Sequence, residues 1–327
     1  MLLQASRDLR FSDASEMVRT AELALFAAER LRPGHHGRAT IADVRGRAWA
    51  ELANAHRVAD DLDRAEKAMA MAVTWQQRGS GDPWLVARIA DLMASLCSDQ
   101  RRFAEAEELL DKVHAFYRRL GERHLAGRAL VKRGVISCNG HDPSGALADL
   151  AEGLELLNVR RDPQLAAHAV LAILFSLVDR GRCRQARIYL WRCRSLFERD
   201  GGRRFQLRVR WLRGRIHAGL GELDRAEREL LAARDGFAAA ASPYNAALVS
   251  LDLAAAWLRQ GKNRQVRQLI EEMIAAFRAL RIAREAVAAL LILREACDRD
   301  EATLDRVRTV AMLLNELERQ PWRRPGR

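Results

Sequence analysis

Apolar and charged positions recur along the chain with a period close to 40 residues. The phrase LDRAE at residues 62–66 returns at residues 223–227, and similar helical patterns lie between the two copies. Within these patterns one small residue recurs at steps of 40 or 41: Ala65, Ala106, Ala146, Ala186 and Ala226, followed by Val266. A period this regular predicts a solenoid, in which each unit buries its apolar face against its neighbours.

Two further positions follow the same period and define two helices in each unit. Four residues after each small residue stands a large apolar one: Met69, Leu110, Leu150, Leu190, Leu230 and Ile270. Twelve residues before it stands a mostly small one: Ala53, Ala94, Gly134, Leu174, Gly214 and Ala254. Apolar side chains at helical spacing, without the alternation of a strand, predict two helices per unit joined by short turns.

Prolines and glycines mark the ends of these helices. Pro83, Pro163 and Pro243 are 80 residues apart, and each follows a residue suited to cap a helix: Asp82, Asp162 and Ser242. Pro143 after Asp142 has the same form. A capping residue before proline predicts a helix start. Glycines in another register, Gly81, Gly121 and Gly201, are expected to end the preceding helices.

The first unit resembles the tetratricopeptide repeat (TPR). It carries a large residue, a leucine, a small residue and a ring, then apolar and small residues: Trp49, Leu52, Ala53, His56, Ala65, Met69 and Ala72. The period exceeds the standard of about 34 residues, so the chain is more similar to longer variants in kinesin light chains and bacterial maltose-activator-like regulators. HEAT repeats are the alternative, but the small-residue pair twelve apart favours TPR.

The predicted fold class is therefore all-α: a right-handed α-solenoid of antiparallel helix pairs, with about six full repeats and partial terminal repeats. Residues 1–41 are predicted to be an N-terminal helix and linker, either a half repeat or a cap. Residues 42–282 form six TPR-like repeats, residues 283–320 a degenerate seventh repeat and C-terminal cap, and residues 321–327 a basic tail.

Composition and motifs argue against membrane insertion and catalysis. At 49% apolar and 30% charged residues the chain is globular, and its longest mostly apolar run, residues 166–178, is too short to span a bilayer. Five cysteines without metal-ligand spacing indicate a reduced, cytoplasmic protein. No hydrolase, nucleotide-binding or metalloprotease motif occurs. We therefore expect no enzyme activity, cofactor or metal.

The TPR resemblance implies that defined positions of each first helix line a concave groove. One of them is the second position of the helix, which holds Arg47, Arg88, Arg128, His168 and Arg208, followed by Leu248. Arg47 can reach Glu51 and Arg88 can reach Asp91 along their own helices. Arg128, His168 and Arg208 have no acid at that spacing, and Lys132 adds charge beside Arg128. Pairing across helices stays open.

Charge along the chain concentrates in the same region. Residues 180–215 contain 13 arginines against two acids, a balance of +11 in a chain whose net charge is +12. Aromatic residues interleave, with Trp191 in this segment and Phe175, Trp211 and Arg215 expected near the groove. Asn54, Arg128 and Lys132 resemble part of a carboxylate-clamp TPR, but Ala50 and Leu92 stand where that clamp needs lysine and asparagine.

These observations predict a non-catalytic TPR scaffold or adaptor that binds an acidic peptide segment or partner protein in its groove. Positive charge and aromatic rings suit carboxylates, and they also suit single-stranded nucleic acid. Nucleic-acid binding through residues 180–215 is therefore one alternative. A sensor module of a signalling complex is another. The oligomeric state is left open.

Overall fold

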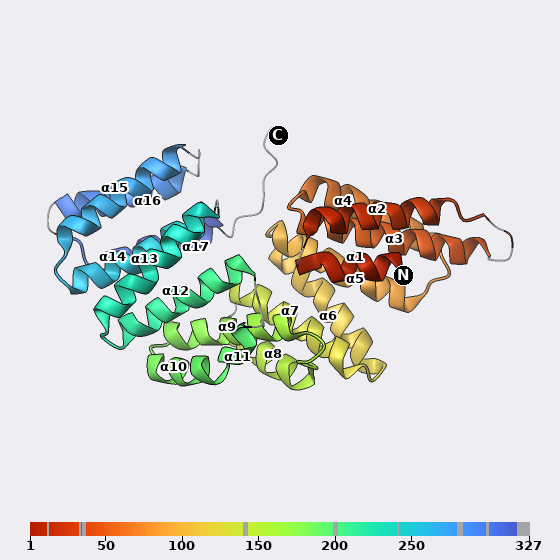
Figure 1. Ribbon diagram of the computed structural model, residues 1–327, viewed down its shortest axis with the longest axis horizontal. Coiled ribbons are helices and arrows are strands. Elements are labelled where there is room, and N and C mark those ends of the chain that lie inside the picture. The colour runs from red at the N-terminus through yellow and green to blue at the C-terminus, as the bar shows by residue number, and fades with distance from the viewer. Residues whose placement is uncertain are drawn as a thin grey trace. The chain divides into compact units, whose positions relative to one another are not determined.

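The computed structural model of the chain is all-α, and the residues that it describes include no β-strand (Figure 1). The described residues are 1–11, 13–32, 34, 37–139, 143–198, 202–240, 242–279, 284–298 and 301–318. The predicted basic tail at 321–327 lies outside them, as do Ser12, Asp142 and Gly201. The predicted all-α fold class is confirmed.

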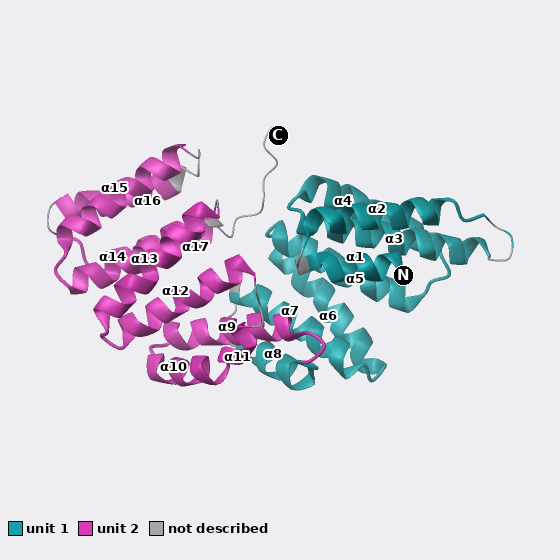
Figure 2. Ribbon diagram, in the orientation of Figure 1, with its two compact units in different colours: residues 1–159, 321–327 teal, residues 160–320 magenta. Residues whose placement is uncertain are grey.

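The helices group into two compact units, coloured separately in Figure 2. Unit 1 comprises residues 1–159 and, outside the described residues, 321–327; unit 2 comprises residues 160–320. The predicted boundaries of the repeat array and its terminal caps stay predictions. Each unit is described below by itself.

Unit 1 stacks helices that are neighbours in sequence. Its elements are α1 (Leu2–Asp8), the 3-10 helix η1 (Leu9–Phe11), α2 (Ala14–Glu29), α3 (Arg38–Val58), α4 (Leu62–Gln77), α5 (Pro83–Asp99), α6 (Phe103–Arg119), α7 (Arg123–Asn139) and α8 (Pro143–Leu156). Helices α3, α5 and α7 are the first helices of three repeats, and each packs against the second helix that follows it. The short α1, which packs on α2 and α3, was not predicted.

Unit 2 continues the same alternation. Its elements are α9 (Pro163–Asp179), α10 (Cys183–Arg192), α11 (Arg194–Glu198), α12 (Arg203–Gly219), α13 (Leu223–Ala239), α14 (Pro243–Arg259), α15 (Asn263–Ala279), α16 (Arg284–Asp298) and α17 (Leu304–Glu318). The single second helix expected after α9 is interrupted at Cys193, so α10 and α11 are separate. Leu190, expected in the core, is only half-buried.

The periodic small residues lie where paired helices cross closely. Ala65, Ala106, Ala146, Ala186, Ala226 and Val266 are all 0% exposed, which confirms their predicted burial. At the crossing of α7 and α8, a methyl group added to Gly134 would lie 2.9 Å from the carbonyl oxygen of Ala146. Only a residue without a side chain fits this approach, so glycine replaces the usual alanine here.

Turn residues repeat with the same period. Gly81 and Gly121 have positive φ angles of 79° and 71°, as expected for residues that end helices. A second series, which the sequence analysis missed, stands between first and second helices: Gly181, Gly221 and Gly261. In earlier repeats this register is occupied by Asp60 and Arg101, which also have positive φ. The left-handed turn is therefore a property of the repeat, with or without glycine.

Candidate ligand-binding site

The nine predicted groove residues all lie on first helices and divide between the two units. Unit 1 holds Arg47 on α3, Arg88 on α5, and Arg128 and Lys132 on α7; unit 2 holds His168 and Phe175 on α9, and Arg208, Trp211 and Arg215 on α12. A continuous basic ladder through all of them stays a prediction. Within each unit, however, the structure brings several of these side chains together.

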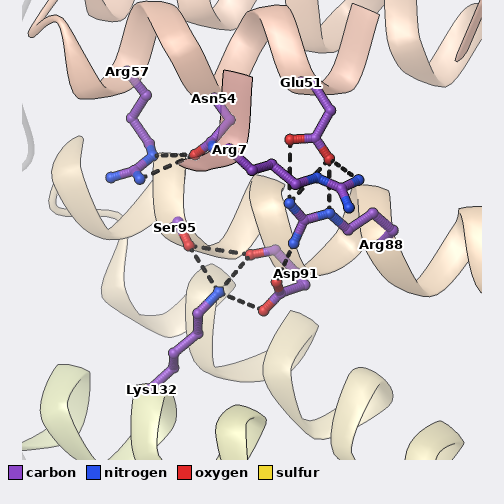
Figure 3. A network of polar contacts seen from close by, with 8 residues as sticks. All are labelled: Arg7, Glu51, Asn54, Arg57, Arg88, Asp91, Ser95 and Lys132. Carbon is purple, nitrogen blue, oxygen red and sulfur yellow. Dashed lines mark hydrogen bonds and ion pairs between the residues drawn. The ribbon is translucent and has the colours of Figure 1, made fainter. Parts of the chain in front are cut away.

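In unit 1 a buried glutamate gathers arginines from two other helices (Figure 3). Glu51 of α3 is 0% exposed. Its carboxylate accepts hydrogen bonds from Arg88 Nε at 3.0 Å and Nη2 at 3.2 Å, and from Arg7 Nη2 of α1 at 2.5 Å. Arg47, which was expected to reach Glu51, instead pairs with Asp82 at 3.3 Å and stands apart from this group.

A second buried acid, Asp91 of α5, joins α5 to α7. Lys132 Nζ donates to its carboxylate at 2.5 Å and to the hydroxyl of Ser95 at 3.2 Å. Arg88 donates to the other oxygen at 3.3 Å, so the predicted Arg88–Asp91 pair is present. Figure 3 shows these contacts, and we call Arg7, Glu51, Arg88, Asp91 and Lys132 the charge network.

The charge network keeps its ions charged in spite of burial. Burial opposes ionisation of Asp91, but the cations Lys132, Arg128 and Arg88 outweigh it and hold the pKa of Asp91 well below its usual range. Burial lowers the pKa of Lys132 to about 8, although Asp91 favours its charged form. Asp91 and Lys132 are thus both ionised at neutral pH, and this contact is one case of the pairing across helices that the sequence left open.

Positive charge nevertheless accumulates around the network. Burial, and then the nearby cations Arg57 and Arg128, lower the pKa of Arg10 to about 10. Arg57 pairs with Asp99 at 2.6 Å and also bonds Asn54. Arg128 lies close enough to Asp91 to help lower the pKa of that acid. This part of unit 1 is therefore a packed, internally paired charge system with a cationic excess.

In unit 2 the predicted residues form an aromatic–arginine cluster: Phe175, Arg208, Trp211 and Arg215, all half-buried. The Phe175 and Trp211 rings meet edge to face, with centroids 5.3 Å apart. The guanidinium groups of Arg208 and Arg215 stand 5.8 Å and 5.9 Å from the centre of the Phe175 ring. Cation–π contact and ring packing therefore hold both arginines in place.

Two acids anchor one side of this cluster. Trp211 Nε1 donates to Asp252 of α14 at 2.6 Å, and Arg215 pairs with Asp179 at 2.8 Å and Asp252 at 3.5 Å. Burial raises the pKa of Asp252, while Arg215 and Trp211 favour its ionised form. Arg215 is thereby paired with these acids, and both Arg208 and Arg215 keep their guanidinium groups next to the Phe175 ring. His168 lies beside Phe205 instead, with ring centres 4.8 Å apart.

The acids in both units are the partners that sequence reasoning missed or paired differently. Their contacts join residues separated by about one repeat: Glu51 to Arg88 by 37, Asp91 to Lys132 by 41, Asp179 to Arg215 by 36 and Trp211 to Asp252 by 41. Adjacent first helices present such positions to one another. A search for opposite charges one period apart, within four residues, would have found the three ion pairs, but not the hydrogen bond from Trp211 to Asp252.

The described residues contain no group of histidine, cysteine and carboxylate side chains that could hold a metal ion. Cys97, Cys183 and Cys297 are buried thiols, while Cys138 and Cys193 are partly exposed. Within the described part of the chain, no helix is long and apolar enough to cross a bilayer.

The aromatic–arginine cluster of unit 2 offers a ligand guanidinium groups held beside an aromatic surface. This combination suits a carboxylate attached to an apolar group.

Comparison with known proteins shows the fold. No family profile matches the sequence, and no curated protein matches it. A solved structure, a Rap protein complexed with Competence and Sporulation Factor, is similar over 97% of this chain and 86% of its own, with a TM-score of 0.70 and 12% identity. At that identity the likeness concerns the fold alone, and it supports a TPR-like helical repeat class.

Proposed function

We propose that the chain is a non-catalytic TPR-like scaffold that binds an acidic peptide segment, or the acidic face of a partner protein, through the aromatic–arginine cluster of unit 2. The observation that carries this proposal is the position of Arg208, held at the Phe175 ring and half-buried beside Trp211. A guanidinium fixed in this way loses little freedom when it pairs with a carboxylate.

Two further observations support a binding role. The similar Rap protein was solved in a complex with Competence and Sporulation Factor, so one chain of this fold is known to hold a ligand. The 40-residue period also supports placing the chain among the longer TPR arrays, such as those of kinesin light chains and bacterial regulators.

The test uses fluorescein-labelled ten-residue peptides that share one leucine and differ only in their number of glutamates. We expect affinity to rise with glutamate number. Arg208→Ala should weaken binding by about 1.5 to 3 kcal/mol, the range for hydrogen bonds to charged groups. Trp211→Ala should also weaken binding, because it removes the ring that packs against Phe175. Arg213→Ala is the matched control, because Arg213 lies exposed on the same helix outside the cluster. Fluorescence anisotropy measures all four proteins.

Nucleic acid is the competing ligand for the arginines of residues 180–215. Oligothymidine should then bind with a log–log salt slope of about 0.7 per neutralised phosphate. A peptide lacks this condensed counterion layer and gives a shallower slope. Tight oligothymidine binding that disappears in Arg208→Ala, with no dependence on peptide glutamates, would replace the present proposal.

A further inference from the structure

The outer face of α10 is unusually apolar for an exposed surface. Trp191 is 66% exposed and Ile188 is 52% exposed. Residues three and four apart share one side of a helix, so Ile188 and Trp191 stand together with Arg184 and Arg187. We call these four residues the α10 face. The opposite side of α10, with Cys183 and Ala186 buried, packs on α9 and α12.

The α10 face is surrounded by positive charge. No aspartate or glutamate occurs between Arg180 and Phe197. Arg187 pairs with Glu222 of the α12–α13 turn at 3.1 Å. The guanidinium of Arg194 stands 4.9 Å from the centre of the Trp191 ring. Among the residues that the structure describes, Arg184 and Arg192 have no ion pair, so their charge is available to a partner.

We propose that the α10 face is a docking surface for an acidic amphipathic helix of a partner protein, separate from the aromatic–arginine cluster. Its centre is apolar and its rim is charged, which is the arrangement of protein–protein interfaces. Tryptophan and arginine are also the residues that most often dominate binding energy there. Charge complementarity selects the partner: apolar residues must contact Ile188 and Trp191, and carboxylates must reach Arg184 and Arg192.

The aliphatic centre distinguishes this partner from nucleic acid. A base can stack on Trp191, but Ile188 offers it neither charge nor an aromatic ring, and interfaces with nucleic acid are more polar than protein–protein interfaces. A leucine on a partner helix supplies an aliphatic contact that suits both Ile188 and Trp191. The α10 face therefore fits an acidic, apolar protein segment better than a phosphate backbone.

The probe is a fluorescein-labelled peptide of about 18 residues, five helical turns, with leucines along one side and glutamates elsewhere. A scrambled peptide of equal composition is its control. We expect the helical peptide to bind the full chain and the double variant Ile188→Ser/Trp191→Ser to weaken binding by at least about tenfold. Arg184→Ser/Arg192→Ser should weaken it at about 100 mM salt and less so at about 1 M, where charges are screened.

The matched control variant is Leu23→Ser/Phe26→Ser on α2. Leu23 and Phe26 are also exposed and three residues apart, and Arg30 stacks on Phe26. This variant should bind the peptide as the unmodified chain does, and circular dichroism should show that all variants stay helical. No binding to the unmodified chain, or equal binding by Ile188→Ser/Trp191→Ser, would overturn the proposal. So would oligothymidine or phosphatidylserine vesicles binding in place of the peptide with the same dependence on Ile188 and Trp191.

Discussion

Removing different charged residues of the charge network should lower the free energy of unfolding by different amounts. Asp91 lies among Lys132, Arg88 and Arg128, whereas Lys132 has Asp91 as its paired acid. Removing Lys132 leaves Asp91 with two cations, but removing Asp91 leaves three cations close together in a buried place. The network should therefore tolerate the loss of its lysine better than the loss of its aspartate.

Asp91→Asn is accordingly predicted to destabilise the chain by about 3 to 5 kcal/mol, the cost of breaking a buried pair on one side. Lys132→Met should cost less, and the double variant less than Asp91→Asn alone. Urea unfolding followed by circular dichroism measures the differences. Glu108→Gln is the control, since its pair with Lys112 is exposed to solvent and should contribute little to stability. A smaller cost for Asp91→Asn than for Lys132→Met would contradict this reading.

The stability of the folded chain should also depend on pH through the ionisation of Asp91. The pKa of Asp91 is lowered in the folded chain from the ordinary 3.8, so its contribution is complete above that value and declines as pH falls further. The amide that Asp91→Asn introduces cannot titrate. The difference in unfolding free energy between the unmodified chain and Asp91→Asn should therefore shrink from about pH 5 towards pH 2. Urea titrations at several pH values test this, and a constant difference would refute it.

At the scale of helices, the close crossing of paired helices limits the size of the side chains that fit between them. Ala146→Leu forces three extra carbons into the crossing of α7 and α8, where Gly134 already allows no methyl group. We predict a loss of about 1 to 3 kcal/mol from overpacking. Ala151→Leu is the matched control, because Ala151 is exposed on the same helix. Thermal unfolding of the two variants should separate, and equal midpoints would argue against a tight crossing.

Helix boundaries and buried small residues were predictable because each repeats many times along the chain. Proline after Asp82 marks the start of α5, and the alanine register follows from period alone. The seven residues of α1 offer too few positions for a periodic signal, and the interruption at Cys193 has no marker such as proline or glycine. The fold could be predicted because these sequence signals repeat along the chain, rather than because of local helix propensity.

The candidate sites were less predictable, because their geometry depends on the stacking of separate helices. The positions of Arg208 and Trp211 followed from the repeat register, but their partners Phe175 and Asp252 lie one repeat away on either side. Arg7 pairs with Glu51 from α1, a helix that the sequence pattern did not predict. From spacing along α3 alone, Glu51 was expected to pair with Arg47. The choice between partners is made by distances that only the folded chain defines.

At the scale of the whole molecule, stability should be distributed in segments. Most helices pack mainly on their sequence neighbours, although α17 also packs on α14, so a local defect should open its surroundings first. Ala65→Leu is predicted to speed amide hydrogen exchange in α3 to α5 and leave α14 to α17 unchanged. Ala226→Leu should speed exchange in α12 to α14 and leave α3 to α5 unchanged. Exchange measured by mass spectrometry compares them, and uniform acceleration by either variant would indicate one cooperative structure.

The scarcity of lysine gives the chain an unusual chemical property. Only four of its 55 basic residues are lysines. Lys67 and Lys112 are exposed, Lys262 pairs with Glu227 at 2.6 Å, and Lys132 is held in the charge network with 14% of its side chain exposed. An acylating reagent should therefore label Lys67 and Lys112 quickly, and Lys132 only when α5 and α7 separate. Arginine side chains do not react with such a reagent. The rate at which Lys132 is labelled therefore reports how often α5 and α7 separate within unit 1.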